Sequence, residues 1–142
     1  MRYLFDASSF LELVKQKKSR ILENQYVLDL TFYELCNAIW KEVHLFKSIN
    51  RNEGLKLIKS LEIILTRLNV LRIKEELSSI HNLAITEALT AYDAAYIHFA
   101  EKNKLVLVTE DKKLYKKARK YVQVLNSNGI LNTNKQNRNS EG

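Results

Sequence analysis

Residues 105–111 read Leu-Val-Leu-Val-Thr-Glu-Asp, and this stretch decides the fold class. The apolar run that ends at Thr109 is of the type that lies buried on both faces in a parallel sheet. We expect a basic helix to follow it over about 111–119. A strand buried on both sides and followed by a helix predicts an α/β fold with a mainly parallel central sheet.

The rest of the chain shows the same alternation of strands and helices. Apolar runs predict further strands at 2–5, 26–30, 70–73 and 122–125. Helices are expected from Ser9, from Thr31 to about Phe46, and over about 52–68, 75–87 and 90–103. The first two begin with capping-box patterns, Ser9-x-x-Glu12 and Thr31-x-x-Glu34, in which a hydroxyl and a carboxylate satisfy the first free amides of a helix.

The length indicates one domain. A chain of 142 residues suits one hydrophobic core and is too short for two domains of ordinary size. The segment from Asn126 onward is rich in Asn and poor in apolar residues beyond Ile130 and Leu131. We therefore expect a domain over residues 1–131 and a disordered polar tail over residues 132–142.

The chain is basic, with a formal net charge of +7. Such a surplus suits an anionic partner such as nucleic acid or an acidic polypeptide, although a merely soluble basic protein has the same balance. A run of cations lies beside Asp111 and could either steer a phosphate backbone or form a solvated helix face. Its members are Lys112, Lys113, Lys116, Lys117, Arg119 and Lys120.

The cellular compartment expected from the sequence is the cytoplasm. Cys36 is the only cysteine, so no intramolecular disulfide can form and a reducing compartment is the default. No stretch approaches the roughly 20 apolar residues of a membrane span. The first six residues already reach a carboxylate, Asp6, and lack the apolar region of a signal peptide.

Four acids are expected at one edge of the sheet. Asp6 follows the first strand, and Asp111 follows the strand that ends at Thr109. Glu34 and Asp93 lie where helices are expected to begin. Because ligands bind at the carboxyl ends of parallel strands, these four side chains converge if the first and the 105–109 strands are neighbours. Each acid taken singly could instead be a helix cap or a loop residue.

Four converging carboxylates predict a cation site. Two such charges 4 Å apart repel by about 4 kcal/mol at an effective dielectric constant near 20. Oxygen ligands select a hard ion, so we expect Mg²⁺ or Mn²⁺, which can activate water and hold a phosphate. Water is the expected nucleophile, since no Ser, Cys or His arrangement supplies another. The three histidines lack metal-ligand spacing.

The sequence resembles the PIN-domain nucleases, and within them the small VapC-type toxins of toxin–antitoxin pairs. The similarity rests on Tyr3-Leu-Phe-Asp-Ala-Ser-Ser9, Leu30-Thr-Phe-Tyr-Glu-Leu-Cys-Asn-Ala-Ile39, Thr90-Ala-Tyr-Asp-Ala-Ala-Tyr96 and Leu107-Val-Thr-Glu-Asp-Lys-Lys-Leu114. These segments span nearly all of the chain to about residue 125. The resemblance implies a three-layer α/β/α fold and a Mg²⁺- or Mn²⁺-dependent endoribonuclease that an antitoxin blocks.

The resemblance also implies roles for single residues. Asp6, Glu34, Asp93 and Asp111 are expected to be the catalytic metal ligands, with Thr109 helping to hold the acidic site. Ser8 is a candidate for contact with substrate or water, although helix capping also explains it. Glu110 is a possible further acid. We also expect a homodimer, with an antitoxin helix bound in a groove near the site.

Two other functions remain open from the sequence. A non-catalytic RNA- or protein-binding module could retain this fold, but it would be expected to lose some of the four acids. A structure-specific DNA nuclease is the other alternative, and such enzymes carry large insertions that 142 residues hardly accommodate.

Overall fold

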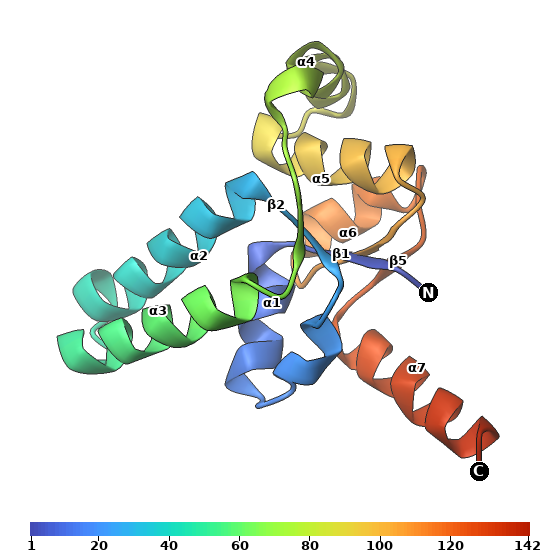
Figure 1. The fold of residues 1–142 in the computed structure, drawn as a ribbon. Helices are drawn as coiled ribbons and strands as arrows, with labels where there is room; N and C mark the ends of the chain where they lie inside the picture. Colours follow the sequence, from blue (N-terminus) through green and yellow to red (C-terminus); the bar gives the residue numbers. More distant parts are fainter.

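A sheet of five short parallel strands forms the centre of the molecule (Figure 1), in a computed structural model that describes residues 1–142. The strands are β1 (Tyr3–Phe5), β2 (Tyr26–Leu28), β3 (Asn69–Leu71), β4 (Val106–Val108) and β5 (Val124–Leu125). Their order is β3-β2-β1-β4-β5, and every neighbouring pair is parallel. The direction of winding therefore reverses between β1 and β4, where doubly wound sheets bind their ligands.

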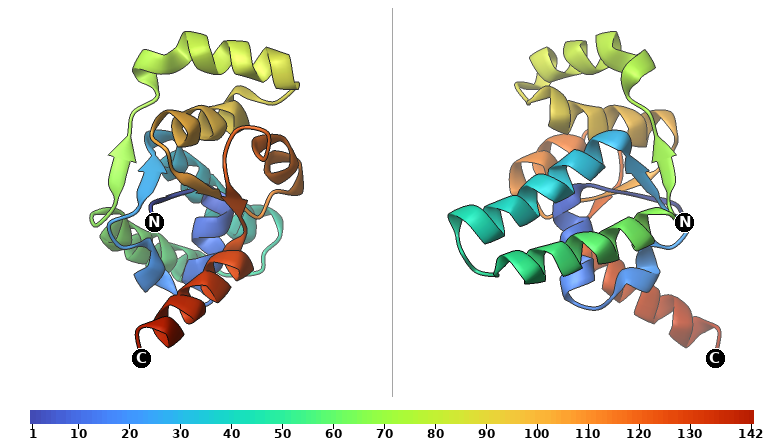
Figure 2. Two further views of the ribbon diagram at one scale, coloured as in Figure 1. Left: turned by 90° about the vertical axis from the view of Figure 1, so that its right-hand side faces the viewer. Right: turned by 60° about the vertical axis from the view of Figure 1, so that its left-hand side comes forward.

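Seven α-helices cover the two faces of this sheet (Figure 2). They are α1 (Ala7–Lys15), α2 (Asp29–Trp40), α3 (Arg51–Leu65), α4 (Leu77–Glu87), α5 (Ala91–Lys102), α6 (Lys112–Ala118) and α7 (Ser127–Ser140). Leu4 packs with residues of α4, α5 and α6, whereas Phe5 packs with residues of α1, α2, α3 and α7. Successive residues of one strand thus serve two cores, which confirms the predicted three-layer α/β/α architecture.

Two helix starts differ from the capping-box prediction. α1 begins at Ala7 and not at Ser9, because Asp6 is its N-cap and accepts a hydrogen bond from the Ser9 N–H at 2.9 Å. α2 begins at Asp29, and the hydroxyl of Thr31 accepts a hydrogen bond from the Leu28 N–H at 3.2 Å. Glu34 therefore lies in the second turn of α2, where a helix-start role does not explain it.

α2 and α3 lie side by side and extend away from the sheet (Figure 2). α2 continues directly into a π-helical segment, Lys41–Leu45, before the chain turns into α3. Gly54 of α3 packs against this segment so closely that a Cβ there would lie 2.6 Å from Cγ2 of Val43. The missing side chain lets the two parts of this arm approach each other.

The C-terminal segment differs from the predicted disordered tail. Residues 127–140 form α7, which includes most of the 132–142 segment. Asn126 caps this helix by accepting a hydrogen bond from the Gly129 N–H at 2.8 Å, and Ile130 is fully buried. A cap and one buried anchor start the helix, although the residues after Leu131 are polar. None of the seven helices combines the length and the apolar character that crossing a membrane requires.

Candidate active site

The ends of β1 and β4 bring the first two predicted acids together. Phe5 pairs with Val108, and the Asp6 N–H donates a hydrogen bond to the Val108 carbonyl at 3.2 Å. The predicted adjacency of the first and 105–109 strands is thus confirmed. Asp111 follows β4 as the N-cap of α6, so both acids stand at the carboxyl edge of the sheet.

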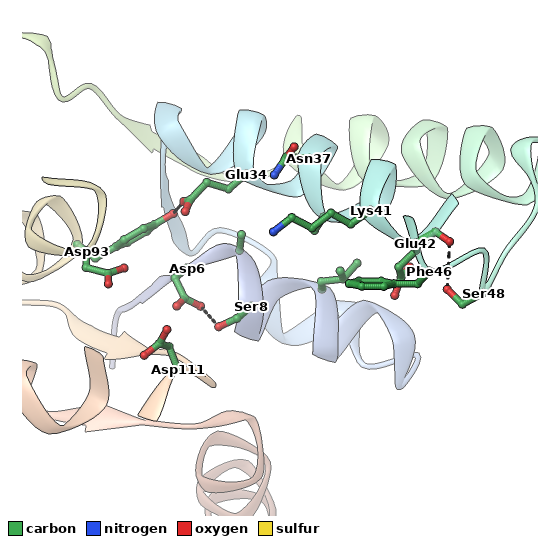
Figure 3. A pocket seen from close by; sticks show the side chains of 14 residues that line it. Asp6, Ser8, Glu34, Asn37, Lys41, Glu42, Phe46, Ser48, Asp93 and Asp111 are labelled. Carbon is green, nitrogen blue, oxygen red and sulfur yellow. Dashed lines mark hydrogen bonds between the residues drawn. The ribbon is translucent and has the colours of Figure 1, made fainter. Parts of the chain in front are cut away.

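All four predicted acids line one cleft of about 560 Å³ at this edge. Asp6 and Asp111 come from the strand ends, Glu34 from α2 and Asp93 from the first turn of α5. Figure 3 shows the carboxylates of Asp6, Asp93 and Asp111 gathered at one end of the cleft, with Phe46 at the other. Segments far apart in sequence therefore converge here as the strand positions predict.

Asp6 is the most buried of these acids, with 6% of its surface exposed. One carboxylate oxygen, Oδ1, accepts hydrogen bonds from the Ser8 hydroxyl at 2.7 Å and the Ser9 N–H at 2.9 Å. The other oxygen accepts one from the Thr109 hydroxyl. Burial raises the pKa of Asp6, and these hydrogen bonds oppose the rise because they favour the charged form. The network fixes one orientation of the carboxylate.

Thr109 connects Asp6 to Asp111. Its hydroxyl donates to Asp6 and accepts a hydrogen bond from the Asp111 N–H at 3.0 Å. One carboxylate oxygen of Asp111 accepts from the Leu114 N–H at 2.9 Å, so this acid is a helix cap as well as a cleft residue. The capping explanation considered for Asp111 is correct, but it accounts for only one of the two oxygens.

Glu34 is held by a residue that the sequence did not single out. The Tyr96 hydroxyl donates to Oε1 of Glu34 at 2.5 Å and lies 2.7 Å from the Thr31 hydroxyl. Tyr96 and Thr31 are both buried, and the sequence placed Tyr96 in a family motif and Thr31 in a capping-box pattern without giving either a role at the site. Their spacing is the available signal, since Tyr96 is three residues after Asp93 and Thr31 three before Glu34, which places each pair on one helix face.

The acids interact electrostatically. Burial is the main cause that raises the pKa of Glu34, and repulsion from Asp6 and Asp93 adds to it. Burial likewise raises the pKa of Asp93, with repulsion from Asp111 and Asp6 as the next causes. Lys113 opposes the rise at Asp93. The cleft therefore concentrates negative charge at its acidic end, where the burial of Asp6 weakens screening by water.

The donor set of this cleft fits a hard divalent cation. Carboxylate and hydroxyl oxygens are the ligands that Mg²⁺ and Mn²⁺ prefer. No three of the acids stand close enough together to ligate one ion jointly as the side chains lie. This spacing still suits Mg²⁺, which usually retains several waters and takes one or two carboxylates directly.

Other polar residues are arranged differently from the predictions. Ser8 is not a helix cap, since its hydroxyl donates to Asp6 and accepts from the Glu110 N–H at 3.0 Å. The Glu110 side chain is directed away from the cleft, because its Oε1 accepts from the Ser127 N–H at 2.6 Å. Glu110 thus anchors α7 in place of adding a further acid.

The basic run after Asp111 is divided between two roles. Lys117 and Lys120 lie 3.8 and 3.1 Å from Oε2 of the buried Glu87, so they pair with an acid in the fold. Lys113 lies near enough to Asp93 to lower its pKa. The cation that lines the cleft itself is Lys41, at the start of the π-helical segment, and its side chain extends toward the acidic end (Figure 3).

The PIN domain profile matches residues 2–120. The chain belongs to the PIN domain family. Two relatives from Pyrobaculum aerophilum match nearly the whole PIN domain. Exonuclease VapC9 is 34% identical over 126 residues, which cover 87% of this chain and 91% of the relative. Ribonuclease VapC3 is 32% identical over 126 residues, which cover 82% of this chain and 95% of the relative. The PIN domain described here is therefore of VapC type.

Solved structures match the same PIN domain. The crystal structure of PAE2754 from Pyrobaculum aerophilum has a TM-score of 0.76 and 30% sequence identity, and the match covers 92% of this chain and 93% of that chain. VapBC from Salmonella typhimurium, in a DNA-bound crystal structure, has a TM-score of 0.61. The match covers 89% of this chain and 98% of that chain. At 14% identity, the second likeness concerns the fold alone.

Proposed function

We propose that this VapC-type PIN domain is a divalent-cation-dependent ribonuclease that hydrolyses RNA phosphodiester bonds and acts as the toxin of a toxin–antitoxin pair. The observation that carries the proposal is the convergence of Asp6, Glu34, Asp93 and Asp111 on one cleft. The names of its relatives, a ribonuclease and an exonuclease, support a nuclease with RNA among its substrates. A non-catalytic module would not need to retain all four acids.

The four acids have different roles, which follow from their different surroundings. Asp6 and Asp111 would hold the ion, since both are oriented by helix N–H groups and joined through Thr109. Asp93 either completes the coordination of the ion or orients its ligands. Glu34 contacts the ion either directly or through a bound water. A bound divalent ion supplies charge neutralisation and an activated water at this place. Glu34 is suited to accepting a proton, because burial and neighbouring acids raise its pKa.

Lys41 would bind the substrate. It is the only cation among the residues that line the cleft, where Asn37 of the preceding helical turn also lies. An ammonium group there can contact a phosphate oxygen next to the scissile bond while the acids hold the ion. This pairing of acids with one cation lets an anionic strand enter a negatively charged cleft.

The single most informative experiment is a cleavage assay with end-labelled RNA. The purified chain is incubated with mixed RNAs in Mg²⁺ or Mn²⁺, with a chelator as control and with single-stranded DNA as a second substrate. Ribonuclease activity that the chelator abolishes is expected. Internal fragments would indicate an endonuclease, and stepwise loss of terminal nucleotides would indicate the exonuclease mode named for one relative. No cleavage under any of these conditions would favour the binding-module alternative.

Partners are part of the proposal. The cleft has an apolar end formed by Leu11, Ala38 and the exposed Phe46, which suits the apolar face of an antitoxin helix. VapBC of Salmonella typhimurium, solved bound to DNA, shares the fold. A homodimer is proposed from the exposed apolar side chains of the arm, among them Leu55 and Ile63. Light scattering at tens of micromolar tests this, and a monomer would contradict it.

A further inference from the structure

A second cleft lies between the end of α1 and α7, and its lining is basic. This basic groove has a volume of about 440 Å³, and five of its nine lining residues are cations. They are Lys17, Lys18, Arg20, Lys135 and Arg138. No acid lines the groove, and none of the five cations forms an ion pair. Five unpaired like charges in one groove attract an anionic partner, and a polyanion can contact several of them at once.

Two separate parts of the chain build this groove. Lys17, Lys18 and Arg20 come from the turn after α1, where the Lys18 N–H donates to the Leu13 carbonyl at 2.8 Å and closes the helix. Lys135 and Arg138 project from α7, which contacts α1 through the core that contains Ile130. The two sets of cations are thus held at fixed positions relative to each other.

A helix-dipole effect explains only part of this arrangement. A cation in the last turn of a helix is favourable, which accounts for Arg138 of α7. It does not account for Lys17, Lys18 and Arg20, which follow α1 and line the same groove as the cations of α7. Glu12, one turn earlier in α1, accepts a hydrogen bond from Gln16 Nε2 at 2.8 Å and leaves these charges unpaired.

Helix α1 leads from the acidic cleft, which its first residues line, to the groove, which its C-cap residue Gln16 lines. α1 begins directly after Asp6 and spans nine residues, so its far end lies about 13 Å along the axis from the acidic cleft. α7 begins after β5, where the Ser127 N–H donates to Glu110, a residue that follows β4 and points away from that cleft. Figure 1 shows α7 leading away from the sheet toward the C-terminus. A distance of about 13 Å is the rise of about four nucleotides in a helical strand.

We infer that the basic groove binds the phosphate backbone of the RNA strand beyond the cleavage site. This inference rests on the proposed ribonuclease function, because the acidic cleft supplies the point from which the strand continues. Because cations dominate its lining, the groove would contact mainly phosphates and so contribute affinity and orientation independent of sequence. Its effect should be confined to substrates long enough to reach it.

The test compares two double variants and two RNA lengths. Lys135→Gln with Arg138→Gln removes two groove cations, and Lys56→Gln with Lys59→Gln removes two exposed lysines of α3 as a matched charge control. Binding of RNAs of about 4 and about 20 nucleotides is measured by fluorescence anisotropy over a salt series, in an Asp6→Asn background that prevents cleavage. Cleavage of the short RNA by the same double variants with Asp6 intact shows that they are folded.

The groove variant is expected to bind the long RNA about 25-fold more weakly at about 0.1 M salt, with the salt slope reduced by about 1.4 for two lost phosphate contacts. Its affinity for the short RNA and its cleavage of it should match wild type, as should the control variant with both RNAs. Equal losses in both double variants, or unchanged binding of the long RNA, would overturn the inference. Binding of polyglutamate is measured in parallel. If the groove variant lost binding to polyglutamate but not to RNA, the inference would be overturned, because the groove would then bind an acidic protein.

These outcomes separate the inference from the function on which it rests. If the wild-type chain cleaves the short RNA and the groove variant binds the long RNA normally, only the groove assignment fails. If the wild-type chain cleaves nothing but the groove variant loses long-RNA binding, the catalytic proposal fails and the groove assignment holds. If the wild-type chain binds neither RNA, both are wrong.

Discussion

The hydroxyl of Thr109 donates a hydrogen bond to the carboxylate of Asp6, although the two residues are 103 positions apart in the chain. The contact crosses the junction between β4 and β1, where the winding of the sheet reverses. The same hydroxyl also accepts from the Asp111 N–H. One side chain therefore contacts both Asp6, which follows β1, and Asp111, which follows β4. One neutral side chain thus links Asp6 to the backbone of Asp111.

Replacing Thr109 by Val removes this hydroxyl and keeps the shape of the side chain. We expect RNA cleavage to fall about 10- to 100-fold, the usual cost of losing a group that orients a metal-binding residue. Because the Thr109 hydrogen bond lowers the pKa of Asp6, the acid limb of the pH–rate profile should move to higher pH. Thr109→Ser should restore both. If the acid limb of Thr109→Val does not move, the Thr109 hydroxyl has no effect on the pKa of Asp6 and Thr109 serves only in packing.

Tyr96→Phe tests the residue that holds Glu34. The substitution removes a hydroxyl that contacts Glu34 and Thr31, and we expect a loss of about 1–3 kcal/mol in the free energy of unfolding. The Tyr96 hydrogen bond lowers the pKa of Glu34, so its loss raises that pKa further. Activity that needs ionised Glu34 should then require higher pH. Equal pH profiles for Tyr96→Phe and wild type would show that Glu34 does not titrate in the reaction.

Asp6→Asn and Asp111→Asn test the two acids at the strand ends. Each should lower cation-dependent cleavage by on the order of 10²–10³-fold, because charge at the reacting centre is lost. The fold should persist, since asparagine caps a helix about as well as aspartate. Circular dichroism and thermal melts check the fold, and end-labelled RNA checks cleavage. A variant that cuts RNA at the wild-type rate would remove its acid from the mechanism.

Asp93→Asn separates charge repulsion from helix capping. Thr90 is the N-cap of α5 and accepts from the backbone N–H of Asp93, so this bond survives the substitution. In chelator, the variant should be at least as stable as wild type, because repulsion from Asp111 and Asp6 is relieved. Mg²⁺ at about 100 times its dissociation constant should stabilise wild type by about 2.7 kcal/mol, and the variant much less. Thermal melts over a Mg²⁺ series measure both effects.

The outcome that favours capping at Asp93 is equally specific. In that case the variant loses stability in chelator, by roughly 0.5–2 kcal/mol, and both proteins respond alike to Mg²⁺. Such a result would return Asp93 to a structural role in the first turn of α5.

The pH dependence of stability in chelator tests the raised pKa of Glu34. Between its ordinary value of 4.5 and its raised value, the folded chain holds more protons at this site than the unfolded chain. The contribution of Glu34 to the free energy of unfolding should therefore fall as pH rises through that window. Below pH 4.5 both states are protonated and the penalty vanishes. The difference in melting temperature between wild type and Glu34→Gln should grow with pH in favour of the variant, and a constant difference would contradict the raised pKa.

The sequence predicted the parts of the fold and site that depend on local patterns. The run at 105–109 indicated a buried parallel strand, and Asp6 and Asp111 were expected at the sheet edge because each closely follows such a run. The parallel sheet, the adjacency of β1 and β4, and the shared cleft agree with these expectations. Strand ends are informative because all parallel strands finish at one edge.

The rest required contacts that no local pattern encodes. Thr31 was expected as the start of a capping box and Tyr96 only as part of a family motif. The contacts that join the Tyr96 hydroxyl to both Thr31 and Glu34 bring two separate helices together and have no local signature. The direction of Glu110 depends on α7, whose polar sequence hid a helix anchored by Asn126 and Ile130. The capping-box pattern at Ser9 was wrong because Asp6, directly after β1, is the N-cap of α1.

The N-cap positions of Asp6 and Asp111 also influence how the gene can change under selection. One G-to-A transition converts an aspartate codon into an asparagine codon, and asparagine retains the helix cap while removing the charge. Alleles that encode a folded but silent protein are therefore a single base change away at either position. A lineage that gains from silencing the enzyme can do so without producing unfolded chains for its proteases, and the silent copies keep the surface that any partner recognises.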